Sequence, residues 1–594
     1  MITPNGELTA AIEQFKQQPG VTAQQVEQLR AALSSDEGML RDLNQEALSG
    51  QLRGFAVQPA TATPPSLIGS YDLNSGVITL PSASFQPTGN AASADLRAVI
   101  QVQEMSVRFG NGRYPDPMSP SGVAPVTQDM VDNLQGTING SPTLAADVKR
   151  AATTPDPGDT ATPHRNHLEN FGFIKGINAG GTYDGPDKTM RLPATRLQSA
   201  NYDAVDMTFV LGHEIEHGFN HPRSRQANDA LYAGARAVAA QPGSVHDYTG
   251  TISTYLKASR NDEAEAEIAG WNAALSRLKQ TNPSANLADM LNTNNPRMRD
   301  FVERDPVTNA VRALPAPPGQ HPLSFNADGT LSPTPNNVEA MGRQYFDRPP
   351  VTPGPTPAGQ RPLGVGERGS SDYPNYYGTH AIEVSIRAER EHAQVHPGVN
   401  HRMTIDMTGL RLSENLLERE GINIAINPGT PQPYYDRSQT PPALHHFNHT
   451  QNGSVNAAHD HQYVPVEPVP VTPAPTAQSS AASLDALSPN DRAMHARIRE
   501  GIVAPISDEA VTRAVHAAKQ QGIERPDQIA SSALVNDRLW VSGAVPGFVA
   551  SVDVNAKTAA QETAAPPSGQ SDAHAHQAQQ AAETQESARN GPRR

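Results

Sequence analysis

The segment Asn201–Asn220, NYDAVDMTFVLGHEIEHGFN, constrains the fold more than any other part of the 594-residue chain. Its apolar run Val205–Leu211 predicts a buried helix. His213 and His217 are four residues apart, so on a helix they differ by about 40° around the axis and about 6 Å along it. Two imidazoles placed in this way bind one metal ion at about 2.0–2.1 Å, and Glu214 between them reaches a water on that ion. The segment therefore predicts a buried metal-binding helix.

The composition limits the ligands and partners that this helix can have. The chain contains no cysteine, so a metal must be held by histidine, aspartate or glutamate. Its net charge is −15, from 46 Lys+Arg against 61 Asp+Glu, which argues against nucleic acid or an anionic membrane as a partner. The sequence contains no run of about 18 apolar residues, so it predicts no membrane span. The first residues lack a signal-peptide pattern, so we expect synthesis in the cytoplasm without a cleavable leader.

Two histidines leave the predicted metal site incomplete, because a catalytic zinc usually has three protein ligands and one open position. A third histidine in the metzincin pattern is excluded, since Asn220 and Arg223 stand where that pattern has glycine and histidine. His221 has the wrong offset and, directly before Pro222, is expected at the end of the helix. The third ligand must therefore come from another segment.

Arg260–Leu278 is the best source of that ligand. The segment is rich in helix-forming residues, with apolar side chains along one face. Glu263 and Glu267 are four residues apart and share a face, whereas Glu265 points about 180° away from the midpoint of that face. Spacing alone leaves open which of the three glutamates binds the metal.

The H-E-x-x-H helix followed by a glutamate-bearing helix resembles the gluzincin metallopeptidases. The resemblance implies a zincin-like α+β fold with Zn²⁺ as cofactor, Glu263 as third ligand and Glu214 as general base. It also implies that Glu267 accepts a hydrogen bond from His213. The chain departs from the family by having Glu rather than Asp at 267, and by placing Glu263 46 residues after His217.

Further segments are expected to complete the site. Residues 180–183 and 188–192 look like a turn and a strand before the metal helix, and in zincin-like folds such an edge strand binds an extended peptide. The same folds usually add a tyrosine or histidine that donates to the oxyanion. Tyr248 is our candidate for this role, with His246, Tyr434 and Tyr435 as alternatives. The histidine-rich run Leu444–Tyr463, with His445 and His461, matches no metal-site spacing and predicts a polar loop or surface segment.

Proline-rich stretches divide the chain into five predicted parts. These are a helical segment (1–55), a zincin-like metallopeptidase region (56–463), a Pro-rich linker (464–483), a small α+β C-terminal domain (484–554) and a disordered Ala/Gln-rich tail (555–594). Residues 301–370 are also proline-rich and are expected to be mainly loop. Helices are predicted at 10–17, 22–33, 94–108, 413–419, 484–501 and 507–521, and strands at 77–80, 381–386, 403–407, 537–541 and 547–554.

The C-terminal part carries three short motifs, namely Ser488-Pro489-Asn490-Asp491, then Ile498-Arg499, and the strand-like Arg538–Gly543. Together with its two predicted helices and Gln-containing tail, it resembles the XVIPCD recruitment domain of antibacterial effectors exported by Xanthomonas-type type IV secretion systems. The resemblance implies docking on the secretion coupling ATPase, injection into a rival bacterium and protection of the producer by a cognate immunity protein.

These expectations combine into a zinc metallopeptidase that acts as a secreted antibacterial toxin. Its substrate would be a target-cell protein or the peptide part of the cell wall, with the periplasm favoured over the cytoplasm as the place of action. Two alternatives stay open. One is a binding effector with a structural metal site, and the other is a cell-wall lytic enzyme whose chemistry lies in residues 381–463.

Overall fold

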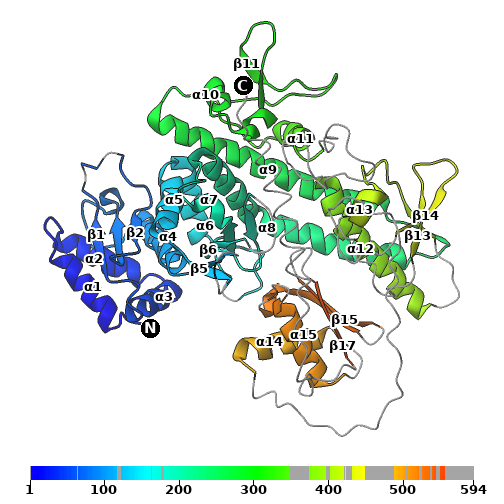
Figure 1. Cartoon of the computed structure of the whole chain (residues 1–594), viewed down its shortest axis with the longest axis horizontal. Helices are drawn as coiled ribbons and strands as arrows, with labels where there is room; N and C mark the ends of the chain where they lie inside the picture. The colour runs from blue at the N-terminus through cyan, green and yellow to red at the C-terminus, as the bar shows by residue number, and fades with distance from the viewer. Residues whose placement is uncertain are drawn as a thin grey trace. The chain divides into compact units, whose positions relative to one another are not determined.

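The computed structural model describes residues 2–59, 61–62, 64–116, 119, 122–161, 164–174, 180–347, 373–396, 402–419, 422, 431–447, 487–502, 506–520, 523, 525–535, 538–543 and 549–554. Helices and strands are mixed, so the predicted α+β class is confirmed at that level (Figure 1). The predicted linker at 464–483, the tail at 555–594 and the run 448–463 lie outside the described residues. Two compact units are present, one holding residues up to Pro222 and Asn261–Tyr345, the other holding Arg223–Arg260 and residues from Phe346 onward.

The first unit begins with the predicted N-terminal helices, which share one hydrophobic core with later elements. Its first elements are α1 (Gly6–Lys16), α2 (Ala23–Leu33), α3 (Glu37–Leu48), β1 (Gly54–Val57), β2 (Ser70–Asp72), β3 (Val77–Leu80), α4 (Ala94–Gly110), β4 (Arg113–Pro115), β5 (Val123–Pro125), α5 (Gln128–Asn139) and α6 (Pro142–Thr153). Strand β3 pairs with β1 in parallel and with β2 antiparallel. Helix α4 carries much of the core, as the apolar face of its sequence predicts.

The second part of this unit contains the metal helix. It comprises β6 (Asn170–Phe173), β7 (Thr182–Asp184), β8 (Thr189–Leu192), α7 (Ala194–Leu197), the beginning of α8 (Ala204–Ala239), the end of α9 (Thr249–Thr281), α10 (Leu287–Asn292), β10 (Val302–Arg304), β11 (Val311–Ala313) and α11 (Pro335–Gln344). The order of the three-stranded sheet is β6-β8-β7, so β7 is an edge strand. Asp203 begins α8 by accepting hydrogen bonds from the backbone N–H groups of Val205 and Asp206.

Helix α8 does not end at His221, and that prediction was wrong. The helix continues through Pro222 to Ala239. Proline cannot donate to the carbonyl of Gly218, four residues earlier, but the His167 ring donates to that oxygen from 2.9 Å. A side chain 51 residues away thus replaces the missing backbone hydrogen bond.

The proline-rich stretch 301–370 is more ordered than predicted over its described part. Besides the hairpin β10–β11, it holds α11, which Thr334 caps through the N–H of Asn337 and which has Pro335 in its first turn. The stretch was predicted to be mainly loop because its prolines were interpreted as breaks. A proline directly after a capping threonine instead favours the start of a helix. Residues 348–370 lie outside the described part of the chain.

The second unit is built on a four-stranded sheet with its own core. Its elements are β9 (Val245–Asp247), α12 (Tyr373–Val395), β12 (Arg402–Ile405), α13 (Glu414–Arg419), β13 (Gln432–Asp436) and β14 (Ala443–Phe447), with sheet order β14-β13-β12-β9. The strand predicted at 381–386 was wrong, because these residues lie inside α12. An alternation of apolar and polar residues over only six positions is compatible with a strand or a helix. Ile382 and Ile386 are also four residues apart, and both are buried on the helix.

The C-terminal segment from residue 487 has a separate small core. Helices α14 (Pro489–Glu500) and α15 (Asp508–Gln520) pack on an antiparallel sheet of β15 (Ile529–Val535), β16 (Arg538–Gly543) and β17 (Val549–Asp553). Both helices and the strands β16 and β17 were predicted from the sequence. Their apolar faces supply buried residues such as Met494, Val515 and Leu539.

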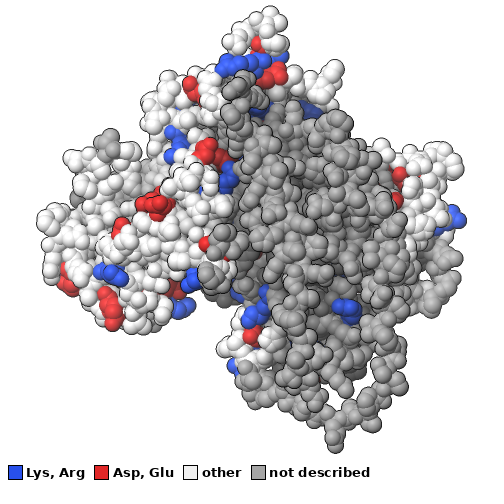
Figure 2. Space-filling view, viewed as in Figure 1, with Lys and Arg blue, Asp and Glu red and all other residues white. Residues whose placement is uncertain are grey.

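No helix within the described ranges is long and apolar enough to cross a membrane. On the face shown in Figure 2, basic and acidic side chains of the described residues are interspersed rather than gathered by sign.

Candidate metal centre

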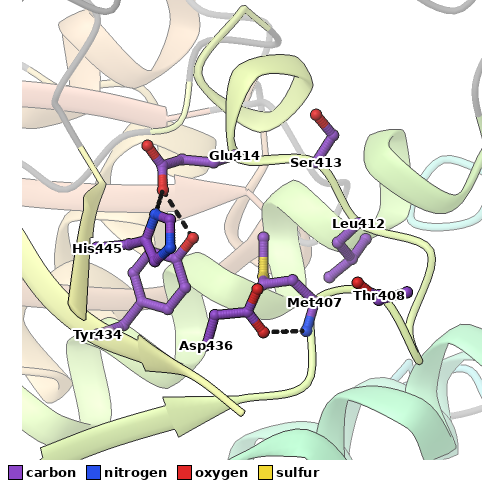
Figure 3. A pocket seen from close by; sticks show the side chains of 8 residues that line it. All are labelled: Met407, Thr408, Leu412, Ser413, Glu414, Tyr434, Asp436 and His445. Atoms are coloured by element: carbon purple, nitrogen blue, oxygen red, sulfur yellow. Dashed lines mark hydrogen bonds and ion pairs between the residues drawn. The ribbon is translucent and has the colours of Figure 1, made fainter. Parts of the chain in front are cut away.

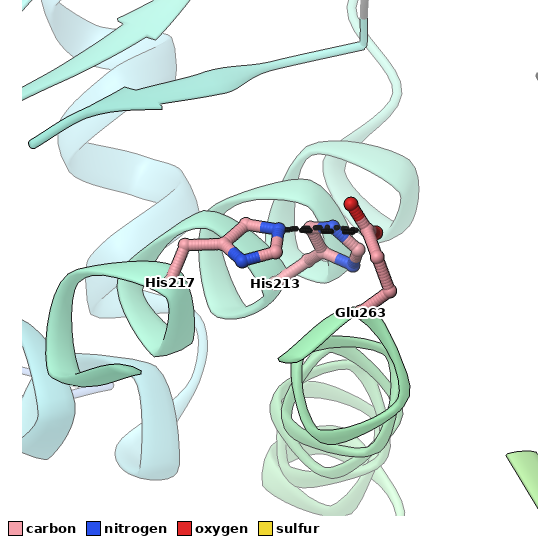
Figure 4. A group of neighbouring side chains, drawn as sticks. All are labelled: His213, His217 and Glu263. Carbon is pink, nitrogen blue, oxygen red and sulfur yellow. Dashed lines mark hydrogen bonds and ion pairs between the residues drawn. The ribbon is translucent and has the colours of Figure 1, made fainter. Parts of the chain in front are cut away.

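Three side chains of the first unit converge as a possible metal site (Figure 4). His213 and His217 on α8 face each other with their Nε2 atoms 3.0 Å apart. Oε2 of Glu263 on α9 lies 3.6 Å from the first of these nitrogens and 3.9 Å from the second. Within the described part of the chain, this is the only group of three such residues whose ligand atoms lie within 4.8 Å of one another.

Two glycines bring the helices close enough to form this group. A Cβ atom on Gly212 of α8 would lie 2.7 Å from Cβ of Ala273, and one on Gly270 of α9 would lie 2.9 Å from the backbone oxygen of Phe209. Larger residues at either position would therefore push the helices apart. Because Gly212 directly precedes His213, this close packing sets the distance from the histidine pair to the glutamates of α9.

The geometry fits a zinc ion. Two ligand atoms about 2.05 Å from a tetrahedral zinc are separated by about 3.3 Å. The three distances of 3.0, 3.6 and 3.9 Å lie around this value. Two nitrogens and one carboxylate oxygen are also ligand types that zinc accepts. His213, His217 and Glu263 would therefore hold the ion, as the sequence predicts.

Each histidine also has a carboxylate on its far side. Nδ1 of His213 lies 3.2 Å from Oε1 of Glu267, and Nδ1 of His217 lies 3.2 Å from Oδ2 of Asp262. A carboxylate at Nδ1 keeps the proton there and leaves the Nε2 lone pair for the metal. Glu267 lies close to the His213 ring but makes no hydrogen bond to it, so its orienting role stays a prediction. Sequence reasoning missed Asp262, which directly precedes Glu263.

Burial and mutual charge shift the pKa values of the site. Burial and the neighbouring His217 lower the pKa of His213 to about 4. Burial opposes protonation of His217 too, but the carboxylates around it, led by Asp262, raise its pKa well above the usual value. Burial raises the pKa of Glu214 and brings that of Glu267 to about 7. The carboxylates that raise the pKa of His217 supply negative charge that a bound cation would neutralise.

Glu214 lies against the backbone directly before the edge strand β7. A Cβ atom on Gly181, directly before β7, would lie 2.9 Å from Cγ of Glu214 and 3.1 Å from its Oε1. The backbone at this end of β7 therefore passes against the carboxylate. The strand predicted at 188–192 is β8, but it is the central strand of the sheet β6-β8-β7, so its expected place at the edge was wrong. The edge strand is β7, which begins within residues 180–183, where a turn was predicted.

Two residues near the site were not anticipated from the sequence. Tyr345 follows α11 and places its ring 6.4 Å from that of His213. Arg297 donates from Nε to Asp206 at 3.1 Å and contributes positive charge near Glu267 and Glu214. Both come from the stretch 296–345, which carries no motif, so only the tertiary fold reveals them.

Three other candidates belong to the second unit and are engaged in contacts there. Tyr248 is buried in the core of the second unit, where its hydroxyl donates to Glu389 at 2.5 Å. His246 hydrogen bonds to the same carboxylate, and Tyr434 donates to Glu414. Each of these side chains thus has a hydrogen-bond partner within the second unit, and an oxyanion role for any of them stays a prediction.

The remaining candidates are engaged in other contacts. Glu265 contributes charge beside Glu216 on another face of α9. His221 contacts Asp156 at 2.7 Å. Tyr435 lies on β13 beneath the guanidinium of Arg402.

Comparison of the chain with protein-family models, with curated proteins and with solved structures finds no match. The function is therefore inferred from the geometry of the site and from the two resemblances carried by sequence motifs.

Proposed function

We propose that the protein is a zinc-dependent peptidase. The observation that carries this proposal is the convergence of His213, His217 and Glu263 on one point, with Glu214 on the same helix beside an edge strand. A structural zinc site needs neither a carboxylate next to the first histidine nor an open strand beside it. A peptidase needs both, one for proton transfer and one for an extended substrate.

A bound zinc would supply Lewis-acid polarisation of the scissile carbonyl and a lowered pKa for its water. The chain's own residues do the rest. Glu214 accepts a proton from the attacking water and passes it to the leaving amine, and the burial that raises its pKa suits this exchange. Glu267 and Asp262 hold the proton of each ligand histidine at Nδ1.

The resemblance of the C-terminal segment extends the proposal to delivery. Its motifs fall on α14 and β16, in a small body of two helices and three strands. We infer that this segment docks on the coupling ATPase of a type IV secretion system, and that a cognate immunity protein protects the producer. The target would be a protein or wall peptide of a rival bacterium, reached in the periplasm.

The decisive experiment expresses the wild type, Glu214→Gln and Glu216→Gln in a sensitive bacterium, in the periplasm and separately in the cytoplasm. Glu216 lies two residues from Glu214 but faces Glu265, so Glu216→Gln is a matched control. We expect about one zinc per chain in all three proteins. Growth inhibition should be lost only in Glu214→Gln and should occur in the periplasm.

Other outcomes point to the alternatives. Undiminished toxicity of Glu214→Gln with full zinc content would favour a binding effector with a structural metal. Toxicity that survives loss of zinc but not deletion of residues 381–463 would favour a lytic activity in that segment. For delivery, removal of residues 484–594 should abolish killing of neighbouring cells and leave toxicity after direct periplasmic expression unchanged.

A further inference from the structure

The second unit contains an open pocket of about 350 Å³ that the proposed peptidase reaction does not use (Figure 3). The pocket lies where β13 and β14 meet the turn after β12 and the start of α13. Its polar lining includes Glu414, Asp436, Tyr434 and His445, and its apolar lining includes Met407 and Leu412.

One side of the pocket is a fixed carboxylate. Oε2 of Glu414 accepts a hydrogen bond of 2.7 Å from the Tyr434 hydroxyl and lies 3.4 Å from Nδ1 of His445. Tyr434 is buried and stacks on Phe447 with ring centroids 4.1 Å apart. Because its phenol is held rigidly, the Glu414 carboxylate is held in one orientation at the edge of the pocket.

A second carboxylate enters from the end of β13. The side chain of Asp436 is buried, with its residue only 7% exposed. Its Oδ1 accepts from the N–H groups of Met407 and Ser438 and from the Ser438 hydroxyl, at 2.7–3.2 Å. No described residue donates to Oδ2, which Figure 3 shows turned away from these bonds toward the pocket. This oxygen can therefore accept a hydrogen bond from a ligand in the pocket.

The charges of the pocket are not balanced by the residues that line it. Glu414 and Asp436 carry two negative charges, and His445 is the only lining side chain that can become positive. The two arginines next to lining residues in sequence, Arg411 and Arg437, are engaged with Asp347 at 2.9 Å and with Asp247 at 3.2 Å. An acidic pocket of this kind attracts a cation, and the buried apolar surfaces of Met407 and Leu412 suit an aliphatic chain.

We propose that this pocket binds an ammonium or guanidinium group on an aliphatic stem, with Asp436 and Glu414 as its acceptors. The Lys or Arg side chain of a peptide has this chemistry, and so does a small free diamine. The proposal does not depend on the peptidase function, since every residue that lines the pocket lies in residues 407–445 of the second unit.

Binding is tested by calorimetry on the full-length chain carrying Glu214→Gln at low salt. The probes are Nα-acetyl-arginine amide, Nα-acetyl-lysine amide, 1,4-diaminobutane and the neutral arginine isostere Nα-acetyl-citrulline amide. The two amino-acid cations should bind and the citrulline probe should not. Binding of the diamine at equal affinity would indicate that a free amine suffices, whereas stronger binding of the amino-acid amides would identify a peptide side chain.

Variants then locate the site. Asp436→Asn and Glu414→Gln keep the hydrogen-bond acceptors that hold Ser438 and Tyr434, but each removes one charge. Each should weaken binding by about fivefold or more. Glu391→Gln removes an equal charge from an exposed position of α12 and should leave binding unchanged.

Equal binding of the citrulline and arginine probes, or unchanged affinity in both pocket variants with unchanged circular dichroism, would overturn the proposal. Loss of binding in Glu391→Gln to the same extent would show that only overall charge attracts the probes. That result would overturn it as well.

Discussion

Nδ1 of His213 lies 3.2 Å from Oε1 of Glu267, on the side of the ring opposite the nitrogen that faces His217. The pair joins α8 to α9 across the candidate metal centre. Since a carboxylate at this position orients the ring and increases its basicity, Glu267 should contribute to metal affinity without contacting the metal.

The first prediction concerns Glu267→Gln, which keeps an acceptor oxygen but removes the charge. Zinc affinity should fall by about 10- to 100-fold while the fold is retained, because the ring of His213 loses its ionic partner. Competition with a chromogenic chelator measures this affinity. Glu265→Gln, two residues away, should leave the affinity unchanged, and equal losses in both variants would contradict an orienting role for Glu267.

The second prediction tests the approach of the edge strand to Glu214. In Gly181→Ala, the new Cβ would lie 2.6 Å from Cγ1 of Val210 and 2.9 Å from Cγ of Glu214. Either β7 or the carboxylate must move, so the toxicity of the periplasmic protein should fall at least about tenfold, as misplacement of a reacting group by about 1 Å does. Zinc content should stay the same.

The control for this change is Gly136→Ala in α5, where an added Cβ meets no atom within 4 Å. That variant should be as toxic as the wild type. Full toxicity of Gly181→Ala would mean that the strand and Glu214 need not be so close for the reaction.

The placements that the sequence anticipated correctly depend on helical periodicity. His213 and His217 are four residues apart, and so are Glu263 and Glu267, so each pair shares one face of its helix. The choice of Glu263 within its helix came from the gluzincin resemblance, and the structure brings this residue to the histidines. Zinc binding and catalysis stay predictions.

What the sequence did not anticipate depends on tertiary contacts. Tyr345 reaches the site from beyond a proline-rich stretch, and the continuation of α8 past Pro222 depends on His167. The segment 381–386 was predicted as a strand because its apolar residues alternate, but six residues are too few to distinguish a strand from a helix. Only the fold shows that these apolar residues are buried on one side of α12.

A third prediction concerns Tyr248, our first candidate for the oxyanion role. Tyr248→Phe removes a buried hydrogen bond to Glu389 and should destabilise the second unit by about 1–3 kcal/mol. Urea unfolding followed by circular dichroism measures this loss. Zinc content and toxicity at low temperature should be unchanged, and a folded variant without toxicity would return Tyr248 to the catalytic site.

A fourth prediction concerns the ion pair of Lys188 and Asp156, whose side chains are both fully buried. His221 on α8 contacts the same carboxylate at 2.7 Å, so the cluster ties the turn before β8 to the metal helix. Lys188→Met leaves a buried charge without its cation and should cost about 3–5 kcal/mol. The double variant with Asp156→Leu should recover part of that loss in urea unfolding, and simple additivity of the two changes would contradict the pairing.

The last prediction is a pH dependence that originates in α3 and α4. Glu46 is 4% exposed and faces Glu104 and Arg108 of α4 together with Asp42 of its own helix. Burial, then the charge of Glu104, raises the pKa of Glu46 to about 10. A carboxyl whose pKa is higher in the folded chain than in the unfolded chain stabilises the fold fully below its unfolded pKa of about 4.5. That contribution is lost as the pH rises toward the folded pKa.

The glutamine in the variant Glu46→Gln cannot ionise. The free energy of unfolding of this variant should therefore equal that of the wild type at about pH 4 and exceed it increasingly as the pH rises. The growth should be at most about 1.4 kcal/mol per pH unit between about pH 5 and pH 9. Denaturant unfolding at several pH values measures it. Glu7→Gln, a change at an exposed position, is the control, and its difference from the wild type in the free energy of unfolding should not grow with pH. A gap between Glu46→Gln and the wild type that narrows as the pH rises would show that Glu46 is ionised within the fold, stabilised there by Arg108.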